Sequence, residues 1–421
     1  MKDINGFRIH NHIGGKQRTS FILFLSVLLF IVGQGDAPTG FRFVGGIGSK
    51  GIPVQVLDHI VCMPVRINRS LPLDFILDTG AAGISCIDEI EAGKLKLEFG
   101  VKSSTSGAGE ETVDSYRLGK VLLSLPGIDF VNPDLSTLPL KKLGPFWGKD
   151  IQGVIGGNIL EQVVTEIDYA NQAVHFYDPK DFHYNGPGER IPIAIYFKSP
   201  YVKAKISVAG IAEPIEGLFL VDTGLRGMVI NGPFHRRRGL VEKSPRTVKN
   251  TLGFGIGGES RGMVGRVKSL SIGGITFNNP VVGFSLDRQG VLASGNFAGA
   301  IGVTFLHRFR IIFNYAEKEM ILEKNKFFAE PFEYDMSGIY FIAEGENFDR
   351  IVVYNVLENS PAADAKLQKG DIIVSIDGRK AGSFTMEEIR RLFKSEGQKV
   401  RLTMERNGKT FAVTLILRRL V

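Results

Sequence analysis

The stretch Phe75-Ile76-Leu77-Asp78-Thr79-Gly80 recurs 144 positions later as Phe219-Leu220-Val221-Asp222-Thr223-Gly224. In both copies an apolar run ends in an aspartate, which is followed by a hydroxyl residue and a glycine. An aspartate at the end of a buried strand is costly unless it has a partner or a chemical task. The glycine permits a sharp turn and the close approach of a second backbone. The repeated stretch therefore indicates two equivalent loops whose carboxylates belong to one site.

Three further pairs of segments keep the same order along the chain. They are Gly127–Pro133 with Gly274–Pro280, Gly153–Gly156 with Gly299–Gly302, and the surroundings of Tyr169 with those of Tyr315, at offsets of 146 or 147. Self-similarity at a fixed period is the signature of a duplicated structural unit. We therefore predict two homologous lobes, at residues 50–182 and 189–326, with a Gly- and Pro-rich connecting loop over 178–192.

Both lobes are predicted to be all-β, because segments such as 65–68 and 202–208 alternate or are β-branched and turn residues separate them. Glycine makes up 51 of the 421 residues, which fits many tight turns. The content of 43% hydrophobic and 23% charged residues excludes wholesale disorder and a multi-span membrane protein. Two cysteines, Cys62 and Cys86, are too few for a disulfide framework, and the sequence leaves open whether they pair.

The two aspartates carry the chemistry if the lobes pack about a pseudo-twofold axis, because Asp78 and Asp222 then meet. Two carboxylates a few ångströms apart share one proton and can hold a water molecule. One acts as a base on the water while the other donates a proton to a carbonyl oxygen. This chemistry needs neither a metal nor an organic cofactor, so none is predicted.

The region 50–326 resembles a retropepsin-like aspartic protease with both lobes on one chain, as in pepsin-like enzymes. The resemblance implies that Asp78 and Asp222 are catalytic. It further implies that Thr79, Gly80, Thr223 and Gly224 support the pair, as do the apolar-Gly motifs Ile155-Gly156 and Ile301-Gly302. It also implies flap hairpins over the substrate, at the Gly-rich stretches with Gly107 and Gly109 in lobe one and with Gly255, Gly257 and Gly258 in lobe two. Ordinary hairpin turns are the alternative for these stretches.

Two features depart from the family pattern or extend it. Leu225 and Arg226 follow the second Asp-Thr-Gly, where small residues are usual. Arg226 would either lower the pKa of the aspartates, recognise an acidic group of the substrate, or pair with a carboxylate elsewhere. Phe146-Trp147 would either wall a specificity pocket or serve as core or loop aromatics.

The segment 333–421 has a different character. Ser360-Pro361 predicts the start of a short helix, and Thr385 with Glu388 has the spacing of a capping box that opens a second helix through Phe393. Strands are expected at 351–356, 372–376, 400–405 and 410–417, and Asn407-Gly408 favours a hairpin between the last two. The segment is therefore predicted to be a small β-sheet domain with two helices.

This segment resembles a PDZ domain of the kind attached to bacterial exported proteases, through Ser337–Phe341 and the long block Asn359–Ile373. The resemblance implies that Gly338, Ile339, Tyr340 and Phe341 bind the C-terminus of a peptide, which adds to a sheet edge. A purely structural domain packed on the protease is the alternative.

The N-terminus has four basic residues against one acid within 1–20, followed by an apolar run over 21–33. A helix of that length covers about 20 Å, less than the roughly 30 Å of a bilayer core. We therefore predict a signal peptide over 1–35; an uncleaved anchor with membrane association, or a buried helix, is the alternative. The chain is expected to be exported, and either periplasmic or membrane-anchored facing the periplasm.

The sequence thus predicts an exported aspartic endopeptidase that hydrolyses polypeptides docked at its PDZ domain. One alternative is an inactive protein that uses both modules to bind peptides. Another is a protease restricted to one membrane or envelope partner. The formal charge is +7, but the sequence contains no nucleic-acid-binding motif, so no nucleic-acid partner is predicted.

Overall fold

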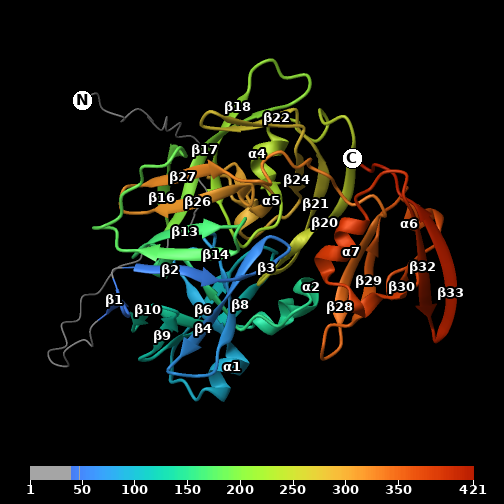
Figure 1. The fold of residues 1–421 in the computed structure, drawn as a ribbon. Coiled ribbons are helices and arrows are strands. Elements are labelled where there is room, and N and C mark those ends of the chain that lie inside the picture. Colours follow the sequence, from blue (N-terminus) through green and yellow to red (C-terminus); the bar gives the residue numbers. More distant parts are fainter. Residues whose placement is uncertain (1–38, 47) are drawn as a thin grey trace, which may run out of the picture. The chain divides into compact units, whose positions relative to one another are not determined.

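The computed structural model describes residues 39–46 and 48–421, and these residues are mostly β (Figure 1). The all-β prediction is therefore confirmed. The signal peptide or anchor predicted at 1–35 lies outside the described residues. Within the described part of the chain, no helix is long and apolar enough to cross a membrane.

Lobe one is built around an eleven-stranded sheet. Its order is β1 (Gly40–Phe43), β10 (Ile128–Val131), β9 (Leu122–Leu125), β4 (Ile60–Ile67), β5 (Leu73–Leu77), β12 (Gly153–Ile155), β6 (Ser85–Asp88), β11 (Leu135–Leu138), β8 (Thr112–Leu118) and β7 (Phe99–Ser106), with β3 (Gln55–Leu57) beside β4. The short helices are α1 (Glu89–Lys94), η1 (Leu140–Leu143), α2 (Gly144–Trp147) and α3 (Gly157–Leu160). The apolar run Phe75–Leu77 of β5 and all of β6 and β12 are buried at the centre of this sheet.

Lobe two repeats this arrangement strand by strand. Its sheet runs β23 (Ile275–Asn278), β22 (Ser269–Ile272), β17 (Ser199–Ser207), β18 (Ile215–Val221), β25 (Gly299–Ile301), β19 (Met228–Ile230), β24 (Val281–Ser285), β21 (Gly258–Arg266) and β20 (Thr247–Gly255), with β16 (Ala194–Tyr196) beside β17. Its helices are α4 (Gly232–Arg236), η2 (Val291–Ala293) and α5 (Val303–Leu306). The order matches lobe one from β10 to β7, so the repeat in the sequence is a repeat in the fold.

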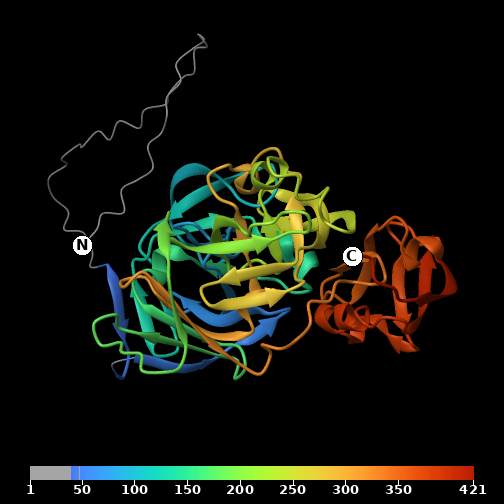
Figure 2. The ribbon, with the colours of Figure 1, turned by 90° about the horizontal axis from the view of Figure 1, so that it is seen from above.

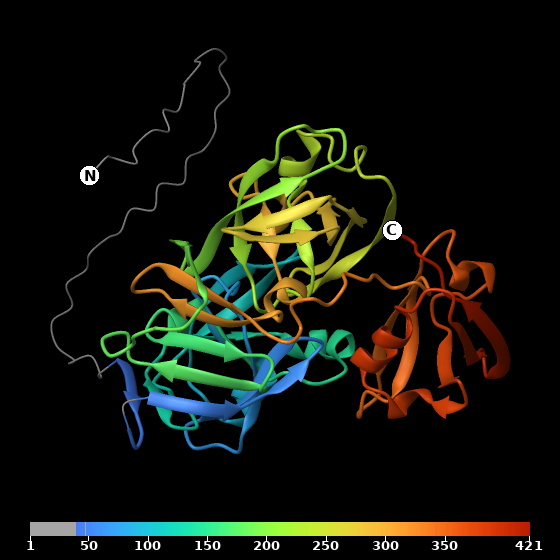
Figure 3. The ribbon, with the colours of Figure 1, turned by 45° about the horizontal axis from the view of Figure 1, so that its top comes forward.

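A third sheet joins the lobes, and the sequence did not predict it. Its order is β15 (Glu189–Pro192), β27 (Glu319–Lys324), β26 (Phe309–Asn314), β13 (Val164–Asp168), β14 (Ala173–Tyr177) and β2 (Gly48–Pro53) (Figure 3). Glu166 of β13 lies opposite Ile312 of β26. These two positions are equivalent by the 146-residue offset, so the pseudo-twofold axis passes through this pair.

The predicted connecting loop over 178–192 needs a correction at its end. Residues Glu189–Pro192 form β15, which pairs with β27 in the joining sheet. Ile191 points into the core and is 3% exposed, while its two neighbours in the strand are more open. The turn residues at 185–188 obscured a strand of only four residues, whose stability comes from its long-range partner.

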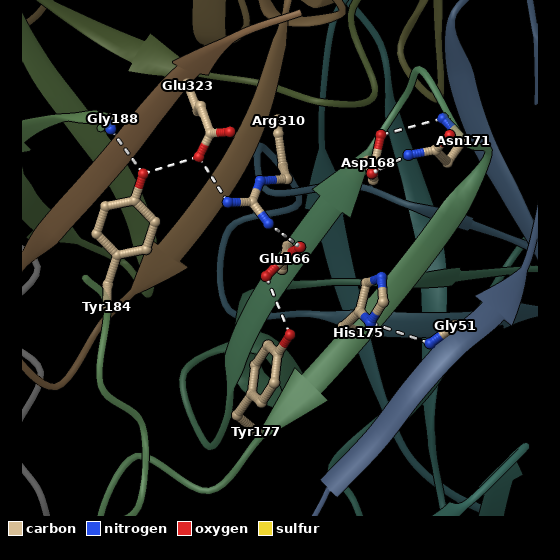
Figure 4. Close-up of polar contacts among 10 residues, drawn as sticks. All are labelled: Gly51, Glu166, Asp168, Asn171, His175, Tyr177, Tyr184, Gly188, Arg310 and Glu323. Carbon is tan, nitrogen blue, oxygen red and sulfur yellow. Dashed lines mark hydrogen bonds and ion pairs between the residues drawn. The ribbon is translucent and has the colours of Figure 1, made fainter. Parts of the chain in front are cut away.

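Charged and phenolic side chains bind across the joining sheet (Figure 4). Arg310 of β26 donates to Glu166 at 3.2 Å and to Glu323 at 2.5 Å. The hydroxyl of Tyr177 donates to Glu166, and that of Tyr184 donates to Glu323. Because Arg310 and Glu166 come from different lobes, this network fixes one lobe against the other.

Cys62 and Cys86 do not pair. Cys62 lies on β4 and Cys86 on β6, with β5 and β12 between them in the sheet. Three strand spacings amount to about 14 Å, whereas a disulfide requires Cα atoms within about 7 Å. Both thiols are buried, and burial raises the pKa of Cys62 to about 12.

The C-terminal segment forms its own sheet and core. The sheet order is β28 (Ile339–Glu344), β29 (Arg350–Val356), β30 (Ile372–Ile376), β32 (Lys399–Arg406) and β33 (Lys409–Ile416), with β31 (Arg379–Lys380) beside β30 (Figure 2). Its helices are α6 (Pro361–Asp364), η3 (Ala381–Ser383) and α7 (Met386–Leu392). Ser360 caps α6, and Thr385 with Glu388 forms the capping box of α7. The predictions for this segment are therefore confirmed to within a residue or two.

Candidate active site

Asp78 and Asp222 each follow the last residue of a buried central strand, β5 and β18. The backbone N–H of Asp78 donates to the carbonyl of Ile155 at 2.9 Å, and that of Asp222 donates to Ile301 at 3.0 Å. Ile155 and Ile301 end β12 and β25, which run parallel to β5 and β18. The two apolar-Gly motifs therefore fix the position of the backbone N–H group of each aspartate.

The glycine of each apolar-Gly motif is a steric requirement. A Cβ atom on Gly156 would overlap the backbone carbonyl of Ile84, and one on Gly302 would overlap that of Leu225. Only glycine lets the motif lie this close to the turn that follows each Asp-Thr-Gly.

Thr79 and Thr223 interlock across the pseudo-twofold axis. The Oγ1 of Thr79 accepts from the N–H of Thr223 at 3.1 Å and donates to the carbonyl of Val221 at 2.7 Å. The Oγ1 of Thr223 accepts from the N–H of Thr79 at 3.0 Å and donates to Leu77 at 2.7 Å. Both threonines are fully buried. Four hydrogen bonds in a dry environment thus hold the two loops in one register.

The two carboxylates face each other within this frame. The Oδ1 of Asp78 accepts from Gly80 N–H at 2.8 Å, and that of Asp222 accepts from Gly224 N–H at 2.8 Å. A Cβ atom on Gly80 would overlap the carboxylate of Asp222, and one on Gly224 would overlap that of Asp78. Each glycine therefore lies against the opposite aspartate, and the two carboxyl groups are hydrogen-bonded to each other.

Burial and mutual charge give the pair one shared proton. Burial raises the pKa of Asp222 well above its ordinary value, and the negative charge of Asp78 raises it further. Burial also raises the pKa of Asp78, but hydrogen bonds from Asp222, Gly80 and Ala81 oppose that shift. The two carboxyl groups therefore titrate as one coupled pair, which keeps a proton at a pH where a free aspartate has lost it.

The Gly-rich stretches are the tips of two long hairpins, β7–β8 and β20–β21. Gly107 and Gly109 lie in the first tip, while Gly255, Gly257 and Gly258 lie at the ends and turn of the second. The tips meet, because Gly257 N–H donates to the carbonyl of Ala108 and Glu111 N–H donates to that of Gly257, both at 3.0 Å. We call these hairpins flap one and flap two.

The tip of flap two also packs against an apolar cluster at the base of the site. Ile256 packs, together with Ala81 and Trp147, against an apolar cluster of lobe one. The side chain of Ile256 also lies against Gly107. Trp147 is therefore a half-buried packing residue of this cluster.

Arg226 contacts a carboxylate away from the aspartate pair, so of the predicted alternatives the structural one holds. Its Nε forms an ion pair with Asp58 at 2.8 Å, and Arg390 of α7 reaches the same oxygen at 2.9 Å. Burial of Asp58 opposes its ionisation, but the charges of Arg390 and Arg226 lower its pKa below the ordinary range. No sequence signal had singled out Asp58 or Arg390.

The residues Gly338, Ile339, Tyr340 and Phe341 belong to the C-terminal domain, separate from the aspartate pair. Gly338 has a φ of +79°, and a Cβ atom there would overlap Ser360. The N–H groups of Ser337 and Gly338 donate to the carboxylate of Asp335 at 3.0 and 2.7 Å. Within the described residues, no cluster of three or more His, Cys, Asp or Glu side chains could hold a metal ion.

Comparison with known proteins agrees with this geometry. Residues 204–305 match a family model described as aspartyl protease, and residues 316–417 match one described as PDZ domain. The first match lies within lobe two, and the second begins in the joining sheet, before the C-terminal domain's own strands.

Solved structures give weaker likenesses. The aspartic proteinase from Irpex lacteus is 14% identical with a TM-score of 0.41, over 67% of this chain and 99% of that chain. A photosystem II D1 C-terminal processing protease is 22% identical with a TM-score of 0.20, over 21% of this chain and 24% of that one. No curated protein sequence matches the chain. The family matches thus liken residues 204–305 to an aspartyl protease and residues 316–417 to a PDZ domain.

Proposed function

We propose that the chain is an aspartic endopeptidase in which Asp78 and Asp222 activate a water molecule. The observation that carries this proposal is the placement of Gly80 against Asp222 and of Gly224 against Asp78. That reciprocal fit brings two carboxylates together in a rigid, buried frame. A binding protein without catalysis gains nothing from a pair of half-buried carboxylates that must share a proton.

The reaction follows from the protonation of the pair. Asp78 takes a proton from the water molecule while the water oxygen attacks the carbonyl carbon of the peptide. Asp222 gives its proton to the carbonyl oxygen, so that a neutral tetrahedral diol forms. Collapse of the diol returns a proton to the departing amide nitrogen and breaks the C–N bond. The flap tips, which bond to each other through backbone groups, are placed to offer such groups to an extended substrate.

The pH profile of hydrolysis tests this proposal. The rate is expected to fall as pH rises through the raised pKa of Asp222, because the proton donor is lost. It is expected to fall again at low pH, where Asp78 takes up a proton and no base remains. The measurement is kcat/KM for an unfolded protein substrate from acidic to neutral pH. A rate that increases steadily into the alkaline range would contradict a shared-proton mechanism.

We also propose export, supported by the basic and apolar composition of residues 1–33. The PDZ domain is proposed to dock polypeptide substrates and to raise their local concentration at the aspartates. Sequencing the N-terminus of the chain recovered from the periplasmic fraction checks the first part. Recovery of the intact chain only from the cytoplasm would overturn export.

A further inference from the structure

In PDZ domains a peptide lies between the strand that follows the carboxylate-binding loop and the second helix. Here these elements are β28 and α7, and we call the surface between them the PDZ face. One edge of β28 pairs with β29. The helix α2 of lobe one contacts β28. The PDZ face is therefore in contact with a segment of the same chain.

Residues 144–148, which comprise α2 and Gly148, touch both walls of the PDZ face. A Cβ atom on Gly148 would lie 2.7 Å from Met386 of α7 and 3.9 Å from Ala343 of β28. The carbonyl of Phe146 accepts a hydrogen bond from Arg390 of α7 at 3.4 Å. Gly144 lies against the ring of Phe348, in the turn after β28. The segment thus occupies the position that a bound peptide would take.

The carboxylate-binding loop also has an internal partner. Asp335 accepts from the N–H groups of Ser337 and Gly338, and the N–H of Ile339 donates to the Ser337 hydroxyl at 3.0 Å. A side-chain carboxylate of the chain therefore takes the donors that would otherwise meet the C-terminus of a peptide. Both ends of the PDZ site are filled from within the protein.

The same segment connects to flap two through its aromatic side chain. The ring of Phe146 stacks on that of Phe254 in β20, with centroids 3.4 Å apart and planes 15° apart. Both rings meet Tyr354 of β29 edge-on, at 5.9 and 5.2 Å. Phe254 also lies 6.1 Å from Tyr340 of β28. We call these four residues the aromatic cluster.

The flap-two hairpin also contacts the C-terminal segment through hydrogen bonds from Asn250 to the Tyr334 hydroxyl at 2.5 Å and from Arg266 to the carbonyl of Val421 at 3.3 Å. A cavity of about 620 Å³ lies between the hairpin and the PDZ domain, lined by residues 247–251 of the hairpin and 354–359 of the domain. At its rim Glu259 accepts from the Tyr354 hydroxyl at 3.4 Å. The aromatic cluster is the tie between flap two and the domain that includes residues 144–148, and removing Phe146 would leave one face of Phe254 without its partner.

The charges around Phe146 indicate which peptide would compete. Its carbonyl accepts from both Arg226, at 3.1 Å, and Arg390. Asp58 pairs with the same two arginines. The charge of Lys394 also lowers the pKa of Asp58, and the charge of Asp335 favours the charged form of Arg390. Three cations face two carboxylates, so a carboxylate in place of the neutral carbonyl would gain an ion pair.

We propose that residues 144–148 are the resident ligand of the PDZ face, and that an incoming peptide with an aromatic residue and a free carboxylate displaces them and releases flap two. This inference rests on the proposed function only for its consequence, since release of the flap opens the way to the aspartates. The displacement itself is a binding event that can be measured without catalysis.

Trp147 is the single tryptophan of the chain and lies within the resident segment, so its fluorescence reports displacement. The probe is the synthetic peptide Leu-Gly-Pro-Phe with a free C-terminus, which copies residues 143–146 without tryptophan and carries its carboxylate at the position of the Phe146 carbonyl. It is added to the full chain carrying Asp78→Asn, which prevents cleavage. We expect a saturable red shift of Trp147 emission and a rise in hydrogen exchange over residues 247–266 by about two- to tenfold, the range that loss of one aromatic pair supports.

Three variants and one peptide serve as comparisons. Phe254→Ala is expected to raise hydrogen exchange of flap two without peptide and to keep the Trp147 response. Arg390→Gln is expected to weaken the peptide response. Lys142→Ala, at an exposed position beside the segment, is expected to leave both signals unchanged. The same peptide with a C-terminal amide, which lacks the free carboxylate, is expected to give a much weaker response.

Binding of the peptide by calorimetry with no change in Trp147 emission would overturn the assignment of 144–148 as the resident ligand. Absence of both binding and a fluorescence change would overturn it equally. A Trp147 response in the Asp78→Asn variant, combined with an inactive natural chain, would leave this inference standing and reject the proposed function instead.

Discussion

Asp222→Asn is expected to lower kcat/KM for an unfolded protein substrate by about 10²- to 10⁴-fold, the range that a positioned general acid or base contributes. The amide cannot release a proton to the carbonyl oxygen as the carboxyl group can. Asp78→Asn is expected to have an effect of the same size, because the base that activates the water is lost. Cleavage products are quantified by mass spectrometry over the acidic to neutral pH range.

The fold should survive these two substitutions. An asparagine oxygen can still accept from the N–H groups of Gly80 and Gly224, and the change removes the repulsion between two adjacent carboxylates. We therefore expect a melting temperature equal to or above that of the natural chain. Asp364→Asn, at a position whose side chain is 61% exposed, is the matched control and is expected to retain full activity. Hydrolysis that persists in either dyad variant would reject the mechanism.

Thr79→Val is expected to destabilise the protease lobes by about 2–6 kcal/mol, because two buried polar groups lose their partner at roughly 1–3 kcal/mol each. These groups are the carbonyl of Val221 and the N–H of Thr223. Valine has nearly the same shape as threonine, so cavity formation contributes little. Urea unfolding followed by the emission of Trp147 measures the effect on the protease lobes.

Thr223, the equivalent of Thr79 in lobe two, provides a second test of this prediction. Thr223→Val removes the equivalent pair of hydrogen bonds, to Leu77 and from Thr79, and should cost a similar free energy. Thr414→Val, on an exposed strand position of the PDZ domain, is expected to change stability by no more than about 0.5 kcal/mol. A large effect in only one of the two interlocked threonines would argue against equivalent roles.

Structural features that are encoded by residues close together in the chain could be predicted from the sequence. The Asp-Thr-Gly repeat revealed the duplication, since one unit of structure used twice leaves the same turn and strand pattern twice. The helix caps at Ser360 and Thr385 placed both helices of the PDZ domain, because capping depends on residues three positions apart. The repeat with an axis between the lobes also led to the expectation that Asp78 and Asp222 meet.

Contacts between distant segments could not be predicted in this way. Strand β15 owes its stability to β27, more than 120 residues later, and Arg226 owes its position to Asp58, so no local pattern marks either.

Residues 144–148 give the clearest case. The sequence left two interpretations of Phe146-Trp147, the wall of a specificity pocket or aromatics of the core or a loop. Only the tertiary structure placed the ring of Phe146 on Phe254 and the carbonyl of Phe146 beside Arg390. The sequence by itself determined the fold class, the aspartate pair and the two kinds of domain, because short-range periodicity, turns and caps encode them. The tertiary structure decided how the PDZ domain contacts a flap, because that contact depends on surfaces assembled from segments far apart in the chain.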